Sequence, residues 1–213
     1  PDAFLTASLR AHPSGASIAR VLAAALEAVD PHAAVLRCMR RSGERMSIAG
    51  QEYDLAALGR VWVVGAGKAA YPMARAVVDL RGERIAGRLG MVQDGYAPAE
   101  AGLGRVECLP AAHPIPDLRG VQATRRIADL LQPTAESDLV LCLISGGGSA
   151  LLTCPAEGIS LEDLRAVTGL LLGCGANINE MNAVPKHLDL VKGAGLARWA
   201  SPALPAALIL SDV

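Results

Sequence analysis

The sequence predicts an α/β fold with an open, mainly parallel sheet that is flanked by helices. Three observations predict it. Residues 60–213 alternate between short apolar runs and amphipathic stretches with helical spacing. The run 138–144, DLVLCLI, is almost wholly apolar, as central strands are in a sheet covered on both faces. Residues 1–59 read mostly as Ala-rich helices, so we divide the chain into a mostly helical lead-in and an α/β core.

The composition excludes several classes of protein. Apolar residues make up 52% of the 213-residue chain, which suits a globular core and argues against disorder. A net charge of −1 gives no general attraction to nucleic acid or to an anionic membrane, and no apolar run approaches the roughly 20 residues needed to span a bilayer. The five cysteines form no C-x-x-C motif, so we expect reduced thiols, a cytoplasmic location and no zinc site.

The lead-in is expected to contain two main helices and a pair of strands. Residues 17–29 carry an apolar stripe with helical spacing. A second helix is expected over 31–40, with Asp30 as its N-cap and Pro31 as its first residue. Residues 46–55, MSIAGQEYDL, indicate a short hairpin or two edge strands around the central glycine.

The core is expected to alternate strand and helix from residue 60 onward. Strands are predicted at 61–64, 89–95, 105–111, 138–144 and 206–213, and helices at 69–80, 121–132, 161–173 and from 177. Ser160 and Asp163 resemble a capping box at the start of the third helix. Pro185 is expected to interrupt or bend the last helix.

Glycine-rich turns follow two of the predicted strands. Ligands in such sheets bind beyond the carboxyl ends of the strands, and glycines leave backbone N–H groups free to converge on an anion. We interpret the triple glycine after 138–144 as a cradle for a phosphate or a carboxylate. The alternative is a tight strand–turn–strand corner, although one glycine usually suffices for that. The residues of the two turns are Gly65, Gly67, Ser145, Gly146, Gly147, Gly148 and Ser149.

Lys68 distinguishes the first glycine turn. The stretch GAGKAA fits the dinucleotide pattern G-x-G-x-x-A of Rossmann-like sheets, but the acid expected about 20 residues later is not in place. It also differs from a Walker A loop, which has four residues between its glycines and Ser or Thr after the lysine. A lysine at such a turn can reach a transferring phosphate, and the alternative is a solvated surface lysine.

Two further stretches concentrate polar side chains. His113 and Asp117 lie in AAHPIPDLRG, a loop stiffened by two prolines. This loop either positions a substrate or is a plain connector in which Asp117 caps the following helix, and both interpretations stay open. The second stretch, 177–195, reads by itself as a solvated helix face, and it holds Glu180, Asn182, Lys186 and Lys192.

Taken together, the motifs resemble the glycerate 2-kinase family, whose members were often labelled hydroxypyruvate reductase and carry a MOFRL-type C-terminal domain. The motifs are GAGKAA at 65–70, HPIPD at 113–117, LISGGGSALL at 143–152, GANINEMNAVPKHLDLVKGAGLA at 175–197 and LILSDV at 208–213. They follow the family's order over nearly the whole chain. The resemblance implies transfer of the γ-phosphate of ATP to the 2-hydroxyl of D-glycerate, with Mg²⁺.

The resemblance also implies which residues form the site, while their individual roles are hypotheses. Lys68 would stabilise charge on the transferring phosphate, and Asp212 would hold Mg²⁺ or accept the hydroxyl proton. The amides of 146–148 would hold a phosphate or the substrate carboxylate. The other residues expected to bind nucleotide or substrate are Gly65, Gly67, His113, Asp117, Ser145, Ser149, Glu180, Asn182, Lys186 and Lys192.

The chain departs from the family's pattern at two positions and in length. Pro185 stands where the family usually has Arg, and Ala194 where it usually has a second Gly. The family's proteins are about twice as long, so we interpret the chain as the N-terminal α/β domain of a longer protein, without the C-terminal domain. An NAD(P)-dependent hydroxypyruvate reductase and a non-catalytic module that binds nucleotide or glycerate stay open as alternatives. Whether the protein forms a homodimer also stays open.

Overall fold

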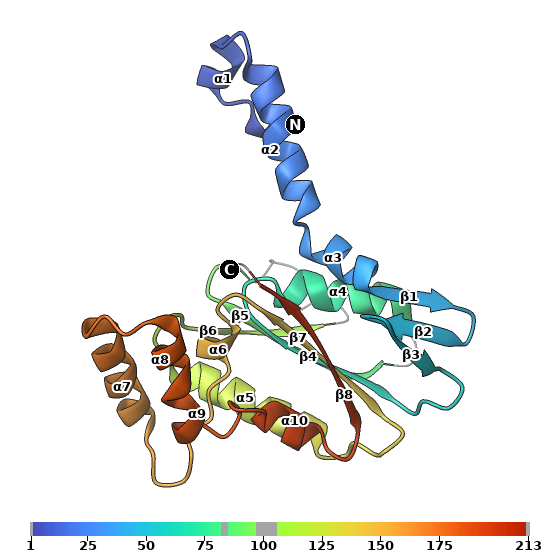
Figure 1. The fold of residues 1–213 in the computed structure, drawn as a ribbon, viewed down its shortest axis with the longest axis vertical. Coiled ribbons are helices and arrows are strands. Elements are labelled where there is room, and N and C mark those ends of the chain that lie inside the picture. Colours follow the sequence, from blue (N-terminus) through green and yellow to red (C-terminus); the bar gives the residue numbers. More distant parts are fainter. Residues whose placement is uncertain (1, 82–84, 97–105, 212–213) are drawn as a thin grey trace.

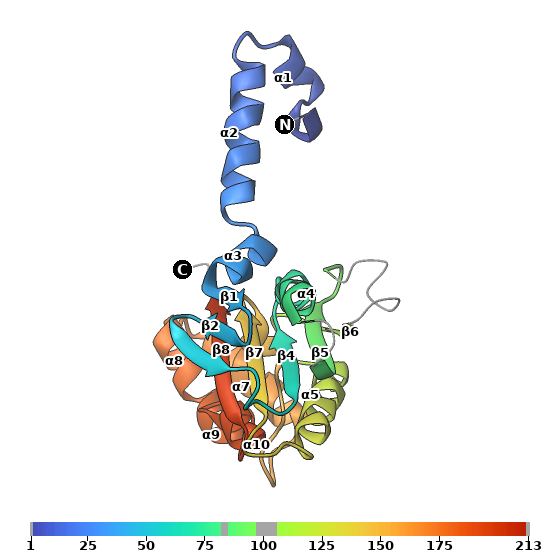
Figure 2. The same ribbon diagram turned by 90° about the vertical axis from the view of Figure 1, so that its right-hand side faces the viewer.

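The computed structural model of the chain describes residues 2–81, 85–96 and 106–211. Its N-terminal part is an arm made of a 3₁₀ turn, η1 (Asp2–Phe4), and two helices, α1 (Ala7–Ala11) and α2 (Gly15–Ala28). In both views α2 projects away from the rest of the molecule (Figure 1, Figure 2). Among the described residues, no helix combines the length and the apolar character that crossing a membrane requires.

A third helix and three short strands connect the arm to the body. Helix α3 (Pro31–Cys38) begins as predicted, because Asp30 Oδ1 accepts a hydrogen bond of 2.7 Å from the backbone nitrogen of Ala33. The expected extension of this helix to residue 40 is wrong. Met39–Ser42 instead forms β1, which pairs antiparallel with β2 (Arg45–Ile48). This pairing is favourable because it buries Met39 in the core. The predicted hairpin is confirmed, since β2 pairs with β3 (Gln51–Asp54) across a tight turn.

A five-stranded parallel sheet forms the body, which confirms the predicted fold class. Its strands lie in the order β6-β5-β4-β7-β8, and every neighbouring pair is parallel. The central strand pair β4·β7 is almost completely buried, as the apolar runs predicted. The strands are β4 (Val61–Ala66), β5 (Ile85–Gln93), β6 (Glu107–Ala111), β7 (Leu139–Ser145) and β8 (Leu204–Leu210).

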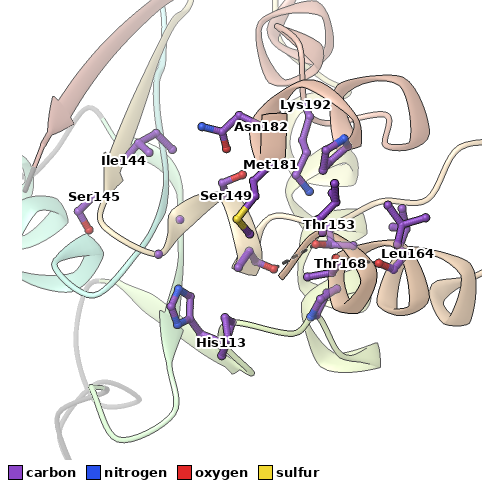
Figure 3. A pocket seen from close by; sticks show the side chains of 18 residues that line it. His113, Ile144, Ser145, Ser149, Thr153, Leu164, Thr168, Met181, Asn182 and Lys192 are labelled. Carbon is purple, nitrogen blue, oxygen red and sulfur yellow. Dashed lines mark hydrogen bonds between the residues drawn. The ribbon is translucent and has the colours of Figure 1, made fainter. Parts of the chain in front are cut away.

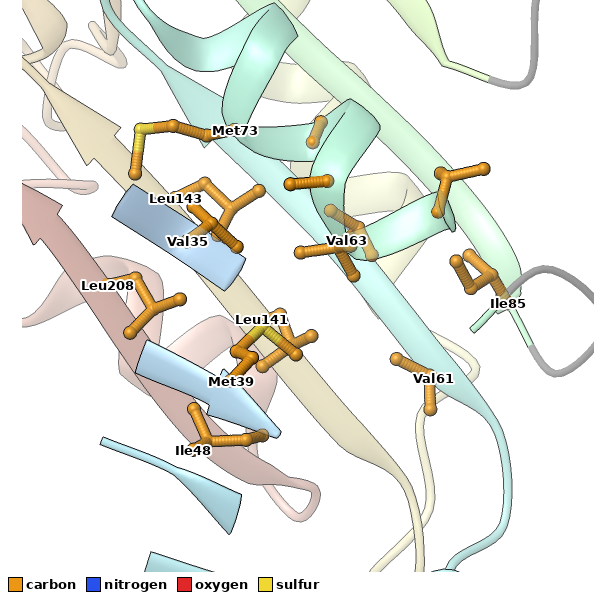
Figure 4. Packing of buried hydrophobic residues seen from close by; sticks show 14 of the residues in the cluster. Val35, Met39, Ile48, Val61, Val63, Met73, Ile85, Leu141, Leu143 and Leu208 are labelled. Atoms are coloured by element: carbon orange, nitrogen blue, oxygen red, sulfur yellow. The ribbon is translucent and has the colours of Figure 1, made fainter. Parts of the chain in front are cut away.

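Helices cover both faces of this sheet and bury alternate strand residues. Helix α4 (Ala70–Arg81) lies on one face, and α5 (Leu118–Leu131) with α10 (Gly195–Ala200) lies on the other (Figure 1, Figure 2). On the α4 face, Val63 packs in one core with Leu141 and with Val35 of the lead-in (Figure 4). The next residue along β4, Val64, belongs to the core on the opposite face, as strand alternation requires.

The last third of the chain contributes four short or peripheral helical elements beside the sheet. They are α6 (Gly148–Leu151), α7 (Leu161–Gly173), α8 (Ile178–Ala183) and α9 (Pro185–Leu188). The capping box of α7 is confirmed, because Ser160 Oγ accepts from the backbone nitrogen of Asp163 and Asp163 Oδ2 accepts from that of Ser160. Pro185 does interrupt the helix that starts near 177, since it opens α9 as a separate helix.

Candidate functional site

A cavity of about 370 Å³ opens beyond the carboxyl end of β7 (Figure 3). Side chains from four segments close it: the loop after β7, the loop between β6 and α5, helix α7, and the segment from α8 to residue 192. Figure 3 shows His113 on one side of this cavity and Asn182 with Lys192 on the other. Its lining consists of His113, Pro114, Pro116, Ile144, Ser145, Gly147, Gly148, Ser149, Ala150, Thr153, Leu164, Val167, Thr168, Leu171, Met181, Asn182, Pro185 and Lys192.

The two glycine-rich loops pack directly against each other. Gly67 has φ +126°, and a Cβ at this position would collide with the side chain of Ser145. A Cβ on Gly148 would lie 2.7 Å from the carbonyl oxygen of Ala66. The loop after β7 leads into α6, so the alternative of a strand–turn–strand corner is wrong. These glycines therefore permit the close approach of two neighbouring loops at the edge of the sheet.

Gly147 contributes to the cavity wall. It has φ +82°, a left-handed conformation that favours glycine, and it precedes the first residue of α6. A Cβ on Gly147 would lie 3.1 Å from Cδ2 of His113. The triple glycine and the HPIPD loop therefore meet at this point, although 33 residues lie between His113 and Gly147 in the sequence.

The two polar residues of the HPIPD loop, His113 and Asp117, have different surroundings. His113 lines the cavity. Asp117 caps α5, because its Oδ1 accepts from the backbone nitrogen of Gly120 at 2.9 Å and its Oδ2 accepts from Arg119 Nε at 2.6 Å. Partial burial raises the pKa of the Asp117 carboxyl, but these hydrogen bonds outweigh burial and hold the pKa below its ordinary value. The connector interpretation thus describes Asp117, whereas His113 lines the cavity.

A buried ion pair supports the wall opposite His113. Lys192 Nζ lies 3.0 Å from Oδ2 of Asp189 and donates to the carbonyl oxygen of Leu152 at 3.1 Å. The side chain of Asp189 is 0% exposed and that of Lys192 is 16% exposed. Asp189 lies within the motif 175–197, but the sequence analysis did not single it out as a site residue.

The segment around α8 and α9 places some predicted residues in the cavity wall and others outside it. Asn182 and Pro185 line the cavity. Glu180 instead caps α8, because its Oε2 accepts from the backbone nitrogen of Asn177 at 2.9 Å. Lys186 is exposed and lies outside the lining. Val184 stays helical, with φ −64° and ψ −49°, although a following proline usually disfavours that conformation.

Lys68 and the first glycine turn lie beside the cavity and outside its lining. The backbone nitrogen of Lys68 donates to the carbonyl oxygen of Gly146 at 3.0 Å. Its side chain is exposed, and its ammonium lies 5.9 Å from the centre of the Tyr96 ring. A Cβ on Gly65 would lie 2.9 Å from the carbonyl oxygen of Leu143, so this glycine too permits close packing.

The predicted metal ligand, Asp212, lies outside the described residues. Within 2–81, 85–96 and 106–211, no group of three or more His, Cys, Asp or Glu side chains is placed to hold a metal ion.

Sequence reasoning missed an apolar half of the cavity. Leu164, Val167 and Leu171 of α7 face it together with Met181 of α8. The sequence contained one signal, because the run 170–172 is LLL and therefore places apolar side chains around more than one face of a helix. Of these three leucines, Leu171 lines the cavity, whereas Leu170 and Leu172 are 71% and 47% exposed.

Known proteins resemble this chain over most of its length. It is 40% identical over 198 residues to the glycerate 2-kinase of Pyrococcus horikoshii, a match that covers 91% of this chain and 42% of that protein. It is 44% identical over 156 residues to the D-glycerate 2-kinase of Thermotoga maritima, covering 73% of this chain and 37% of that protein. These matches confirm the resemblance that the motifs indicated. The chain spans about two fifths of the length of these relatives.

Solved structures agree with the sequence matches. A crystal structure of a protein from Pyrococcus horikoshii superposes with a TM-score of 0.78 at 40% identity, and that of glycerate kinase from Thermotoga maritima with 0.76 at 36% identity. Each match covers 91% of this chain and 43% of the other. The family model described as domain of unknown function (DUF4147) matches residues 17–213. The chain therefore belongs to the DUF4147 family.

Proposed function

We propose that this chain forms the N-terminal, ligand-binding part of a glycerate 2-kinase that transfers the γ-phosphate of ATP to the 2-hydroxyl of D-glycerate. One observation carries the proposal: the glycine loop, His113, Asn182 and Lys192 line one cavity at the carboxyl edge of a parallel sheet. Relatives at 40% and 44% identity are named for this activity. Residues 60–213 would be the α/β core, and the rest of the protein would complete the cleft.

The chemistry that this wall suits is the binding of anions. Phosphoryl transfer depends on alignment and on neutralising charge more than on covalent steps by the protein. Lys192 offers an ammonium at the cavity, and the amides of the triple glycine are candidates to cradle a phosphate or a carboxylate. Ser149 and Asn182 add neutral polar groups that can orient the hydroxyls of glycerate.

Lys68 is proposed to act on the transferring phosphate from the neighbouring loop. Its backbone is fixed against Gly146, and its long side chain is exposed and lies beside the ring of Tyr96, so it can turn toward a bound nucleotide. An ammonium that meets charge developing in the transition state accelerates transfer more than one that binds the ground state equally well.

Mg²⁺ would be held by few protein groups. Asp212 supplies a carboxylate, the oxygen ligand that this ion prefers, and phosphate oxygens with waters usually provide the remaining ligands. Such a site needs no cluster of several acidic side chains, because the phosphates and waters supply most of the ligands. When bound, the ion would neutralise charge on the phosphates.

The packing of the first glycine turn argues against a dinucleotide-dependent reductase. In the fingerprint of such enzymes, the second glycine leaves room for a pyrophosphate to approach the backbone. Here Gly67 is packed against Ser145, so the side of the turn that a Cβ would occupy is already filled by protein.

We also propose a cytoplasmic location, because all five cysteines are free thiols.

A coupled assay of ADP release on the full-length protein tests the proposed function. We expect ADP formation that requires both ATP and D-glycerate, without any change in nicotinamide absorbance. Oxidation of NADH or NADPH in the presence of hydroxypyruvate would instead establish the reductase. Binding of ATP or glycerate without turnover of either would establish a non-catalytic module.

A further inference from the structure

We propose that Asp189 is a positioning residue that holds the ammonium of Lys192 at the cavity wall, so that Lys192 binds an anionic group of a substrate. The group is a carboxylate or a phosphate, which an ammonium binds with similar chemistry. The identity of the substrates rests on the proposed function, whereas the relation between the two residues rests on their geometry alone.

Three fixed donors orient the Asp189 carboxylate. Its Oδ2 accepts from the backbone nitrogen of Cys154 and from Lys192 Nζ, each at 3.0 Å, and its Oδ1 accepts from the backbone nitrogen of Val191 at 3.0 Å. Cys154 and Val191 both belong to the hydrophobic core beneath α5. The carboxylate is therefore anchored to rigid, buried backbone, and its position is set before any ligand arrives.

Lys192 keeps one donor for a ligand. An ammonium has three N–H groups, and two of them are directed to Asp189 and to the carbonyl oxygen of Leu152. The third is available on the side where Lys192 lines the cavity, beside Thr153 (Figure 3). A lysine loses much side-chain entropy when it is ordered, and here Asp189 and Leu152 order it in the free protein. An anion then binds a preorganised donor, which improves affinity.

The backbone donors also preserve the attraction of Lys192 for anions. A carboxylate beside an ammonium would normally cancel much of its field. The amides of Cys154 and Val191 stabilise the negative charge of Asp189 from the core side. Lys192 lines the cavity and its side chain is 16% exposed, so an anion in the cavity can reach its ammonium.

A second buried aspartate supplies a matched control. Asp138 has a side chain that is 2% exposed, and it pairs with Arg60 at 2.8 Å. It precedes β7 at the amino end of the strand, so it lies at the opposite edge of the sheet from the cavity. Asp138→Asn and Asp189→Asn each remove a buried carboxylate from an ion pair, and only the second pair touches the cavity.

The test measures the binding of D-glycerate, ATP and inorganic phosphate separately to the full-length protein by calorimetry, with turnover measured in parallel. We expect Asp189→Asn and Lys192→Gln each to lower the affinity for the same anion by about tenfold or more. The double variant should bind this anion as tightly as Lys192→Gln does, because Asp189 acts only through Lys192. Loss of glycerate affinity alone identifies a carboxylate, and loss of ATP and phosphate affinity identifies a phosphate. Asp138→Asn should lower thermal stability and leave all three affinities unchanged.

Several outcomes would overturn the inference. These are unchanged affinities in Asp189→Asn, additive losses in the double variant, or no binding of any probe to the wild-type protein. If Asp189→Asn does not fold, Asp189→Glu decides, because it keeps the negative charge but moves the oxygen that holds Lys192 Nζ. Wild-type affinities in Asp189→Glu would then overturn the inference. Absence of glycerate phosphorylation by the wild-type protein would refute the proposed function and leave the binding measurements as the test of Asp189.

Discussion

The side-chain oxygen of Ser145 accepts a hydrogen bond from the backbone nitrogen of Ala69, 2.9 Å away, and so joins the loops that follow β7 and β4. A second bond, from the backbone nitrogen of Lys68 to the carbonyl oxygen of Gly146, runs alongside it. The two glycine-rich loops therefore form one unit at the edge of the sheet. This unit places the backbone of Lys68, while its side chain is exposed and lies beside the ring of Tyr96.

Lys68→Met is expected to reduce phosphoryl transfer by about a hundredfold or more while leaving the fold intact. The reason is that the backbone of residue 68 makes the structural contact and the exposed side chain does not. ADP release and the melting temperature should be measured on the same preparation. Turnover at the wild-type rate would remove Lys68 from the mechanism.

Gly147→Val is expected to weaken the binding of nucleotide or glycerate. Its φ of +82° disfavours a β-branched residue, and its Cβ would press on the ring of His113 at 3.1 Å. Gly158→Val is the matched control, because Gly158 has φ +78° and nothing lies within 4 Å of its added Cβ. Both variants should lose about 1–3 kcal/mol of stability from backbone strain. Only Gly147→Val should lose affinity, and equal affinities in the two variants would show that the triple glycine is only a turn.

Pro185→Arg is expected to strengthen the binding of glycerate. Pro185 lines the cavity, so an arginine there would bring a charged donor to the same space as Lys192. The apparent KM for glycerate should fall by about tenfold to a hundredfold. Ala183→Arg is the control, since it adds the same charge at an exposed residue outside the lining. No change in KM or kcat would mean that position 185 has a structural role only.

Ala194→Gly is expected to stabilise the protein by roughly 0.5–1 kcal/mol. Ala194 has φ 69° and ψ 13°, a left-handed conformation that penalises Cβ, at the start of α10. This conformation explains why a glycine is usual at this position in the family that the motifs resemble. Ala197→Gly, in the interior of α10, should instead destabilise by about 1 kcal/mol. Chemical denaturation of both variants checks the two opposite signs.

Asp138→Asn is expected to remove part of the acid sensitivity of the fold. Burial raises the pKa of Asp138, but hydrogen bonds from Trp62, Arg60 and Ala135 outweigh it and hold the pKa at about 2, below the ordinary 3.8. A lowered folded-state pKa stabilises the protein above pH 4, and this contribution is lost as the pH falls toward 2. The melting temperature of the variant should therefore lie below that of the wild type at pH 6 and approach it near pH 2. A difference that is the same at both pH values would contradict this account.

The sequence by itself determined the parallel sheet and the edge at which the site lies. The runs 61–64 and 138–144 are almost wholly apolar, as covered central strands are, and glycines follow each of them. Local chemistry also determined the caps of Asp30 and Ser160, because a cap depends on residues within one helical turn.

Only the tertiary structure decided which polar residues meet in the cavity. Glu180 and Asp117 became helix caps, although they stand in the same motifs as Asn182 and His113. Asp189 stands in the motif 175–197, yet nothing in the sequence indicated that it pairs with Lys192, and no motif marked the apolar wall of α7. Lys192 reaches the carbonyl of Leu152, which is 40 residues away in the sequence. Such contacts depend on how whole elements pack, and the spacing of residues along one element carries no record of that packing.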